Sequence, residues 1–485
     1  MQYTAVRAAI HIASIFALYL SVAMLFPSAV DLYYGNDDWR VFAVSAFFSG
    51  GLAAGVALAT QGSRPVLSTR FGFILVSLLW FTSCVVGAVP LIASSLDLRV
   101  ADAFFEAVSA VTSTGSTVLV GLDLMPPGIL LWRSLLQWVG GLGVIALGLF
   151  ILPFLNVGGV SYFKIESTHV EDQPFDRFSI FVRSLISIYV MLTFLCAMAF
   201  TFAGMRLFDA LNHAMTTLST GGFSTHDASM SFYNDHPTIL WITTIFMFIG
   251  GLPFPVLILF LVRGRADALK DPQIRVYATY ILLFVILGAI YLRLSTDRSF
   301  ASAITHSAFN FVSIITTTGF FTEDYGEWGS LGVAAAFLAM FLGGCSGSTA
   351  GGIKAYRFLI LYELLRNGLR RLVYPNSIQI VRYGDRPVEE DLQRAVVLFL
   401  AAFLMVWAAI ILLLAATGID LVTAVTSALT AITNVGPALG TMVGPDDSFA
   451  SFSDVAKFIM AFAMLLGRLE ILSVLVIFTP MFWRR

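Results

Sequence analysis

The sequence predicts an all-α polytopic membrane protein that contains four similar repeats behind two extra N-terminal spans. Of its 485 residues, 58% are hydrophobic and only 12% are charged, and its mean hydropathy is +0.86. A soluble chain of this length could not solvate its surface with so few charges. The second observation is a short polar segment ending on glycine, which recurs four times within the apolar sequence. Together they indicate a multi-span fold with internal repetition.

Ten stretches are long and apolar enough to cross a bilayer, which needs roughly 20 residues per helix. The first follows Arg7 and lacks a clear cleavage site, so we interpret it as a membrane helix rather than a removed signal. The ten predicted spans are 8–30, 41–60, 71–93, 129–155, 178–204, 237–262, 274–294, 329–364, 391–417 and 455–481.

Within each repeat, a short polar segment lies between two spans. Three of the four segments begin with aspartate, an N-cap residue that suits the positive end of a helix dipole. Segments of this length cannot cross a bilayer. A re-entrant half-helix that enters from outside and stops at mid-membrane explains both their length and their polarity. The segments are Asp102–Ser113, Asp209–Ser219, Ala303–Thr317 and Asp420–Thr433.

The four segments end on tripeptides that are mostly rich in hydroxyl groups and all close on glycine. Their glycines lie 106, 98 and 117 residues apart (221−115, 319−221 and 436−319), which sets the repeat period. Irregular backbone at membrane depth is tolerated only where it is buried in protein or lines a watery path. The tripeptides are Ser113-Thr114-Gly115, Ser219-Thr220-Gly221, Thr317-Thr318-Gly319 and Asn434-Val435-Gly436.

These endings have the chemistry of an ion filter. The C-terminus of a half-helix directs unpaired carbonyl groups and a partial negative charge at the bilayer centre. The glycine that follows can adopt backbone angles closed to other residues, and a ring of carbonyl oxygens can replace the hydration shell of a cation. Close helix packing of the Gly-xxx-Gly kind is the alternative for isolated glycines. Four copies in register instead favour four span–pore helix–span repeats around one central pore.

A glycine-rich run interrupts the second span of the third repeat and is the candidate gate. An uninterrupted helix disfavours such a run, because each glycine costs about 1 kcal/mol relative to alanine. The run lacks the Gly-Lys-Ser/Thr ending of a Walker A loop. It either packs against a neighbouring helix or forms a flexible loop that obstructs the pore beneath the filter, and we favour the second. Its residues are Gly343, Gly344, Cys345, Ser346, Gly347, Ser348, Thr349, Gly351 and Gly352, followed by Lys354, which either lines the pore or extends to the cytoplasm.

Arg468 lies in the middle of the last predicted span. A buried arginine in a bilayer is costly and marks a functional site by default. It could instead be a structural counter-charge that pairs with Glu470 or with loop carbonyls, although residues two apart do not share a helix face. We favour a position facing the pore below the filter, where its charge opposes cations and holds the loop shut.

The charges of the loops predict the orientation. Loops rich in lysine and arginine lie on one side with both termini, and the positive-inside rule places that side in the cytoplasm. The outer side carries the glycine-terminated segments and an excess of acid that would concentrate cations. The acidic residues assigned to it are Asp31, Asp37, Asp38, Asp123, Asp227, Asp235, Glu323, Asp324, Glu327, Asp446 and Asp447.

The repeats divide the chain into an N-terminal two-span domain (1–68), repeat 1 (69–160), repeat 2 (161–268), repeat 3 with the candidate gate loop 343–352 (269–375) and repeat 4 (376–485). We predict no enzyme, because the sequence has no Ser-His-Asp set, His-Glu-x-x-His helix or paired-cysteine cluster. The net charge of −2 says little about partners, and the sequence has no basic tract that would indicate nucleic-acid binding.

With these repeats and glycine endings, the chain resembles the Trk/Ktr/HKT superfamily of potassium transporters, and most closely its TrkH-type bacterial membrane subunits. In that superfamily a glycine in all four filters accompanies potassium permeation, and a serine in the first accompanies sodium preference. Gly115 occupies the first position, so the resemblance implies potassium as the transported ion, with no organic cofactor on this chain. The fourth copy, Asn434-Val435-Gly436, departs from Thr-Gly, so we expect only approximate four-fold symmetry.

The resemblance also implies a location and partners. It implies a multi-pass protein of the bacterial inner membrane, a homodimer with one pore per protomer, and a loop in the third repeat that acts as a gate. A separate cytosolic ring of RCK-type subunits that bind NAD and ATP or ADP would regulate it. Arg366, Arg370 and Arg371 are the candidate contact for that ring, although lipid headgroups would attract them equally well.

A proton- or sodium-coupled secondary carrier, or symport, with alternating access is the alternative function. Such carriers also place broken helices at the midplane, but usually as two inverted repeats around a charged substrate site. Here all four segments enter from the same side, which favours a channel-like path.

Overall fold

The computed structural model describes residues 2–62, 68–146, 174–377 and 379–483. In these ranges the secondary structure is helical except for one small antiparallel hairpin, β1 (Arg382–Tyr383) and β2 (Arg386–Pro387), and an isolated parallel bridge between Leu342 and Ile353. The prediction of an all-α multi-span protein is therefore confirmed, with this hairpin as a minor addition. The predicted boundary at residues 160 and 161 and the end of the predicted span 129–155 lie outside the described residues.

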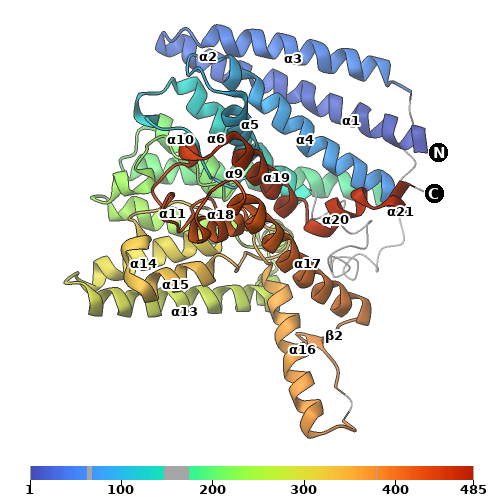
Figure 1. Ribbon diagram of the computed structural model, residues 1–485, viewed down its shortest axis with the longest axis vertical. Helices are drawn as coiled ribbons and strands as arrows, with labels where there is room; N and C mark the ends of the chain where they lie inside the picture. The colour runs from blue at the N-terminus through green and yellow to red at the C-terminus, as the bar shows by residue number, and fades with distance from the viewer. Residues whose placement is uncertain (1, 63–67, 147–173, 378, 484–485) are drawn as a thin grey trace.

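The helices follow one another in four groups after an N-terminal group (Figure 1). The N-terminal group is α1 (Gln2–Ala23), α2 (Leu25–Tyr34) and α3 (Trp39–Ala59). The first two groups that follow are α4 (Thr69–Ala93), α5 (Val100–Val111) and α6 (Pro127–Ala146), then α9 (Pro174–Phe202), α10 (Leu207–Leu218), α11 (Pro237–Gly250) and α12 (Phe254–Arg263). The last two are α13 (Pro272–Ser295), α14 (Phe300–Ile315), α15 (Gly329–Ala339) and α16 (Ala355–Val373), then α17 (Glu390–Ala415), α18 (Leu421–Thr433), α19 (Asp454–Arg468), α20 (Ile471–Leu475) and α21 (Pro480–Trp483). Short 3-10 turns lie at Leu122–Leu124, Ser229–Tyr233, Ala266–Lys270, Tyr325–Glu327, Phe449–Ser451 and Val476–Phe478.

Seven helices of the described chain are long and apolar enough to cross a membrane, or nine if each of two bent pairs counts as one span. The bent pairs are α11 with α12, at 100°, and α19 with α20–Phe478, at 110°. Neither bend was predicted. Between α11 and α12 the chain passes through Pro253, which has no N–H to continue the helical hydrogen bonds.

The predicted span 329–364 is not one helix, because the glycine-rich run interrupts it as predicted. It comprises the eleven-residue α15, a non-helical stretch from 340 to 354, and the start of α16. Figure 1 shows α16 running across the direction of α15 and projecting from the rest of the molecule. The glycine-rich stretch breaks the helix, so the apolar residues on its two sides do not form one rod.

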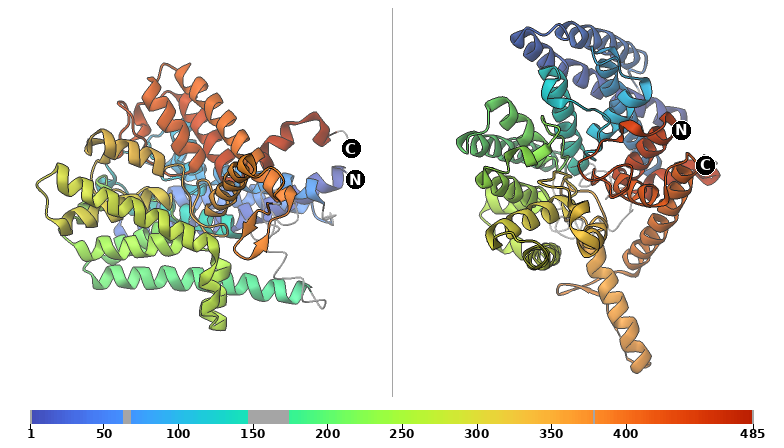
Figure 2. Two further views of the ribbon diagram at one scale, coloured as in Figure 1. Left: turned by 90° about the horizontal axis from the view of Figure 1, so that it is seen from below. Right: turned by 60° about the vertical axis from the view of Figure 1, so that its left-hand side comes forward.

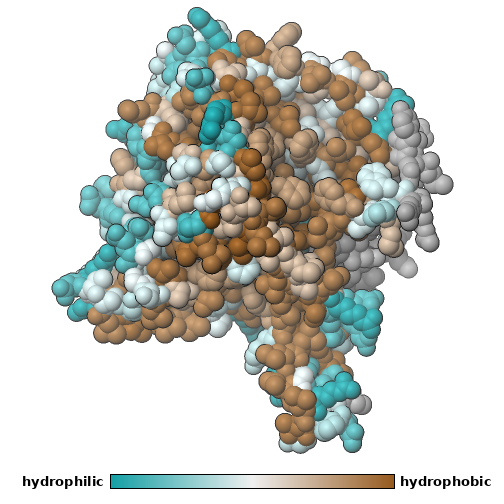
Figure 3. Space-filling view, viewed as in Figure 1, coloured by the Kyte–Doolittle hydropathy of each residue, from teal (hydrophilic) through white to brown (hydrophobic). Residues whose placement is uncertain are grey.

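The helix groups surround a common centre (Figure 2). A helix of one group packs against the short helix of another: α6 on α10, α11 on α14, and α19 on α5. The N-terminal helix α1 packs on α3 and α4 at the periphery. Apolar side chains cover most of the face in Figure 3, with hydrophilic residues mainly along its left and upper margins and in smaller patches on the right and at the free end of α16, as expected for a protein surrounded by lipid.

Candidate functional site

The short helices α5, α10, α14 and α18 converge with their C-termini, but their N-termini differ from the prediction. Asp420 is the N-cap of α18 and accepts a hydrogen bond from Thr423 N at 3.0 Å. Asp102 and Asp209 are not N-caps: they lie inside the first turns of α5 and α10. Their carboxylates there still oppose the positive end of the helix dipole.

All four helices end in the same backbone conformation. A residue in the left-handed region is followed by one ordinary residue and then by a left-handed glycine. The middle residue donates its N–H to the carbonyl five residues earlier, in pairs Thr114–Ser109, Gly221–Thr216, Thr318–Ser313 and Val435–Thr430, at 2.8 to 3.1 Å. The left-handed pairs are Ser113 and Gly115, Thr220 and Gly222, Thr317 and Gly319, and Asn434 and Gly436.

This pattern corrects the second copy by one residue. The equivalent triplet is Thr220-Gly221-Gly222, so Gly222 (φ +77°) corresponds to Gly115, and Gly221 is the middle residue. The prediction aligned the second copy with the others by residue type alone, as two hydroxyl residues followed by a glycine. Because α10 ends at Leu218 and Ser219 is its C-cap, the left-handed position falls on Thr220.

The four triplets close into a ring. A Cβ atom on each left-handed glycine would lie closer than 3.0 Å to the middle carbonyl oxygen of the next triplet, and the fourth triplet meets the first. We call residues 113–115, 220–222, 317–319 and 434–436 the carbonyl ring. The facing pairs are Gly115 with Gly221 O, Gly222 with Thr318 O, Gly319 with Val435 O, and Gly436 with Thr114 O.

Three of the left-handed residues that begin the triplets are serine or threonine, which rarely adopt this conformation. Each such residue costs on the order of 1–3 kcal/mol and persists only where its surroundings determine it. In the fourth triplet Asn434 takes this position, which asparagine tolerates better. Its Nδ2 donates to Thr114 Oγ1 at 2.9 Å and so ties the fourth triplet to the first.

A cavity of about 450 Å³ opens on one face of the ring. All four left-handed glycines line it, together with Asp446 and Asp447. One of the acidic residues predicted for the outer side, Asp31, does not lie in a loop. Asp31 is fully buried in α2 and accepts a hydrogen bond from Gly128 N, at the start of α6, at 2.6 Å.

The glycine-rich residues 343–354 lie against the opposite face of the ring. Thr349 Oγ1 donates to Leu218 O at the end of α10, at 3.0 Å. Gly351 N donates to Thr317 Oγ1 at 2.6 Å, and Gly352 N donates to Thr433 O at 2.8 Å. This segment therefore contacts three of the four helix ends.

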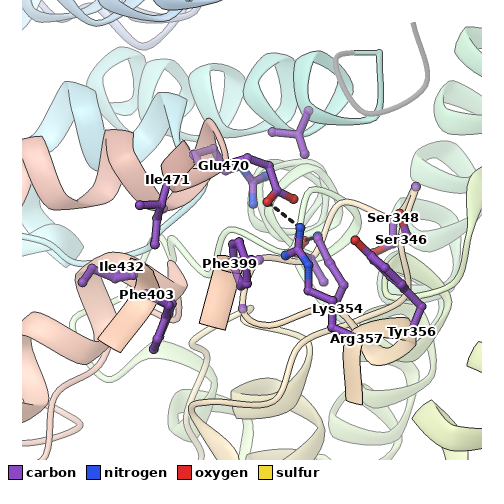
Figure 4. Close-up of a pocket in the computed structure, with 17 residues that line it drawn as sticks. Ser346, Ser348, Lys354, Tyr356, Arg357, Phe399, Phe403, Ile432, Glu470 and Ile471 are labelled. Carbon is purple, nitrogen blue, oxygen red and sulfur yellow. Dashed lines mark hydrogen bonds and ion pairs between the residues drawn. The ribbon is translucent and has the colours of Figure 1, made fainter. Parts of the chain in front are cut away.

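A narrow cavity of about 50 Å³ lies below this segment (Figure 4). Arg468 lines it and is 95% buried, and its guanidinium donates no hydrogen bond within the described chain. Lys354 also lines the cavity, and its Nζ donates to Ala350 O instead of extending away. Arg468 does not pair with Glu470, which binds Arg357 Nη2 at 2.6 Å because the chain turns sharply at Glu470 (φ +62°).

Two further elements of the site were not predicted. Arg133 in α6 and Glu106 in α5 form a buried ion pair beside the ring, and Gln137 in α6 contacts the second triplet. Charged residues inside apolar segments are rare and usually functional. That signal alone singled out Arg468 and would have singled out Arg133 and Glu106 equally.

A ring of peptide oxygens between two cavities, in a protein of many apolar spans, defines the class of membrane transport proteins for cations. Comparison with known proteins agrees. The family model described as "TrkH: Cation transport protein" matches residues 42–485, and this chain belongs to that family.

Relatives match the chain over nearly its full length. The Trk system potassium uptake protein TrkI of Halomonas elongata is 40% identical over 476 residues, covering 96% of this chain and 95% of the relative. The Trk system potassium uptake protein TrkH of Escherichia coli (strain K12) is 37% identical and covers 99% of both. The crystal structure of the potassium transporter TrkH from Vibrio parahaemolyticus superposes with a TM-score of 0.92 at 35% identity, over 100% of both chains.

Proposed function

We propose that this chain carries potassium ions across a bacterial inner membrane through the carbonyl ring. The single observation that carries this proposal is the closed cycle of contacts between each left-handed glycine and the next triplet. Four half-helices that end at one ring place carbonyl oxygens and partial negative charge around one axis. The names of the Halomonas and Escherichia relatives support potassium as the ion.

The outer cavity would collect ions before they enter the ring. Asp446 and Asp447 line it, and negative charge at a mouth of low dielectric raises the local cation concentration. In this orientation both termini are cytoplasmic. The same proposal divides the chain into an N-terminal two-span domain and four repeats, with boundaries after residues 68, 160, 268 and 375.

On the inner side, residues 343–354 and Arg468 would close the path. The loop hydrogen-bonds to three helix ends, and Arg468 brings a positive charge beneath it. Opening would require these bonds to break and the loop to move from the axis. A cytosolic nucleotide-binding RCK-type subunit that acts on a homodimer of this chain would control that movement.

Tracer flux into liposomes tests the proposal. The purified chain should pass potassium and rubidium much faster than sodium and lithium, and Gly115→Ser should lower that preference. A Cβ at Gly115 would collide with Gly221 O in the neighbouring triplet, so the substitution distorts the ring. Flux that requires a proton or sodium gradient would instead support a coupled carrier, and absence of potassium flux would refute the proposal.

A further inference from the structure

The amide side chain of Gln137 reaches from the first repeat to the second triplet of the carbonyl ring. It is completely buried. Its Nε2 donates to Gly221 O at 2.6 Å, and its Oε1 accepts from Phe223 N at 3.1 Å. The two bonds hold the backbone on both sides of Gly222. Both partners of the buried amide are therefore backbone groups next to the ring.

The second triplet is the one that needs such support. Its middle residue, Gly221, has no side chain, whereas the other middle residues are Thr114, Thr318 and Val435. Thr114 and Thr318 are each anchored through their hydroxyls, which bond to the hydroxyl two residues earlier at 2.7 and 2.8 Å. Two consecutive glycines without an anchor would leave this part of the ring with the widest conformational freedom.

Gln137 occupies the space of the missing side chain. A Cβ built on Gly221 would lie closer than 3.0 Å to Cδ, Oε1 and Nε2 of Gln137. The amide therefore substitutes sterically for a residue at position 221. It also supplies the hydrogen bonds that fix the backbone.

The corresponding positions in the other repeats are apolar. Gln137 lies three residues before Gly140 in α6. A Cβ added at Gly140 would collide with Val111 O at the end of α5. The glycines at the matching place in the second and fourth repeats, Gly250 and Gly467, face Leu218 O and Ile432 O. A fully buried methionine lies three residues before each of these glycines: Met247 before Gly250 and Met464 before Gly467. In the third repeat, the fully buried Met340 likewise lies three residues before Gly343. Among the four repeats, only the first has a polar residue at this position, and that residue, Gln137, contacts the second triplet, whose middle glycine has no side chain to anchor it.

We propose that Gln137 is a positioning residue that sets the cation selectivity of the carbonyl ring. By holding the carbonyl of Gly221 and the left-handed Gly222, it keeps the second triplet in register with the other three. Discrimination between potassium and sodium depends on where the carbonyl oxygens lie and how freely they move. This inference rests on the proposed function of the ring as the path for potassium.

The principal experiment compares the potassium-to-sodium flux ratio of the parent protein with that of Gln137→Met in liposomes. Methionine has a similar length and occurs at this position in the other repeats, but it makes neither hydrogen bond. We expect the ratio to fall at least about fivefold, which corresponds to about 1 kcal/mol, the typical net contribution of one of the two lost hydrogen bonds. Gln393→Met is the matched control, because it removes a hydrogen bond to Val388 O, which follows β2 and is not part of the carbonyl ring, and it should leave the ratio unchanged.

A pair of size-changing variants provides a second measurement. Gly221→Ala alone should abolish most potassium flux, since the new methyl group collides with Gln137. Adding Gln137→Ala removes the three colliding atoms, so the double variant should regain flux with a lowered potassium-to-sodium ratio. This rescue decides the question even if Gln137→Met fails to assemble.

The outcomes separate the two proposals. A parent protein that carries no potassium refutes the proposed function. If the parent carries potassium selectively, an unchanged ratio in folded Gln137→Met, or a double variant as inactive as Gly221→Ala, overturns the role of Gln137 alone.

Discussion

Arg133 Nε lies 2.7 Å from Glu106 Oε1, and the two side chains are 1% and 0% exposed. Around this ion pair, Arg133 also donates to Ser224 O at 3.3 Å and to Thr117 Oγ1 at 3.2 Å, and its guanidinium covers the ring of Phe223 at 4.1 Å. The pair therefore ties α5 and α6 to the chain segments that leave the first and second triplets. The pair thereby stabilises the positions of the first and second triplets of the carbonyl ring.

Replacing one member of this pair should destabilise the protein strongly. Arg133→Met leaves a buried carboxylate without its partner, and loss of such a partner typically costs about 3–5 kcal/mol. Thermal unfolding in detergent should show a large fall in melting temperature. Arg394→Met is the control, because its pair with Glu390 is 76% and 80% exposed and such pairs contribute about 0–1 kcal/mol. Equal melting temperatures for the two variants would contradict this stabilising role.

Gly222 should be as intolerant of substitution as the other left-handed glycines. Gly222→Ala adds a methyl group that overlaps Thr318 O, and it forces φ +77° on a residue with a side chain. We expect potassium flux to fall by more than about tenfold, since left-handed strain and a steric collision each cost at least about 1 kcal/mol.

Gly51→Ala is the control for that experiment. A Cβ added at Gly51 would meet no atom within 4 Å, and the residue lies in α3, away from the ring. The flux of this variant should match that of the parent. Normal flux in Gly222→Ala would show that the second triplet is not in the register assigned to it.

Arg468→Ala should give a leakier protein. Its guanidinium lies in the narrow cavity beneath residues 343–354 and has no hydrogen-bond acceptor in the described chain, so under the proposed function its charge would repel cations in the path. Basal potassium flux should rise by about an order of magnitude, equivalent to about 1.4 kcal/mol of repulsion in a partly screened site. The exposed Arg366→Ala should leave flux unaltered. Unchanged or reduced flux in Arg468→Ala would count against a blocking role.

The cluster of acidic residues around Asp324 predicts a pH dependence of stability. Burial raises the pKa of Asp324, and the nearby carboxylates of Asp446, Glu327 and Asp447 raise it further. A carboxyl with a raised pKa in the folded state binds its proton more tightly there, so stability falls as pH rises from about 4, the value for an unfolded chain, through the folded pKa.

Asp324→Asn should remove this dependence. Asparagine keeps the acceptor for Gly326 N but carries no charge. Its melting temperature should therefore exceed that of the parent at pH 7, and the difference should vanish near pH 4. A parent that becomes more stable relative to Asp324→Asn as pH rises would reverse the sign of this argument.

Several features were predictable because they depend on local composition. The long apolar runs predict spans, and the glycine-rich run of 343–352 disfavours a helix whatever its surroundings. Other features were not predictable from single positions. The polar character of Gln137 is ordinary when taken alone, and its meaning appears only beside Gly221 and against the methionines of the other repeats.

The order of amino acids was enough to establish an all-α membrane protein with four short polar helices ending near glycine, since helix length, hydropathy and glycine content act within a few turns of chain. The folded arrangement was needed to show that Gly222 and not Gly221 is the left-handed residue, that α16 turns away from α15, and that Glu470 binds Arg357 instead of Arg468. These outcomes depend on contacts between residues about one hundred or more positions apart. Steric fit and charge pairing at such distances are set by packing, which periodicity along the chain does not record.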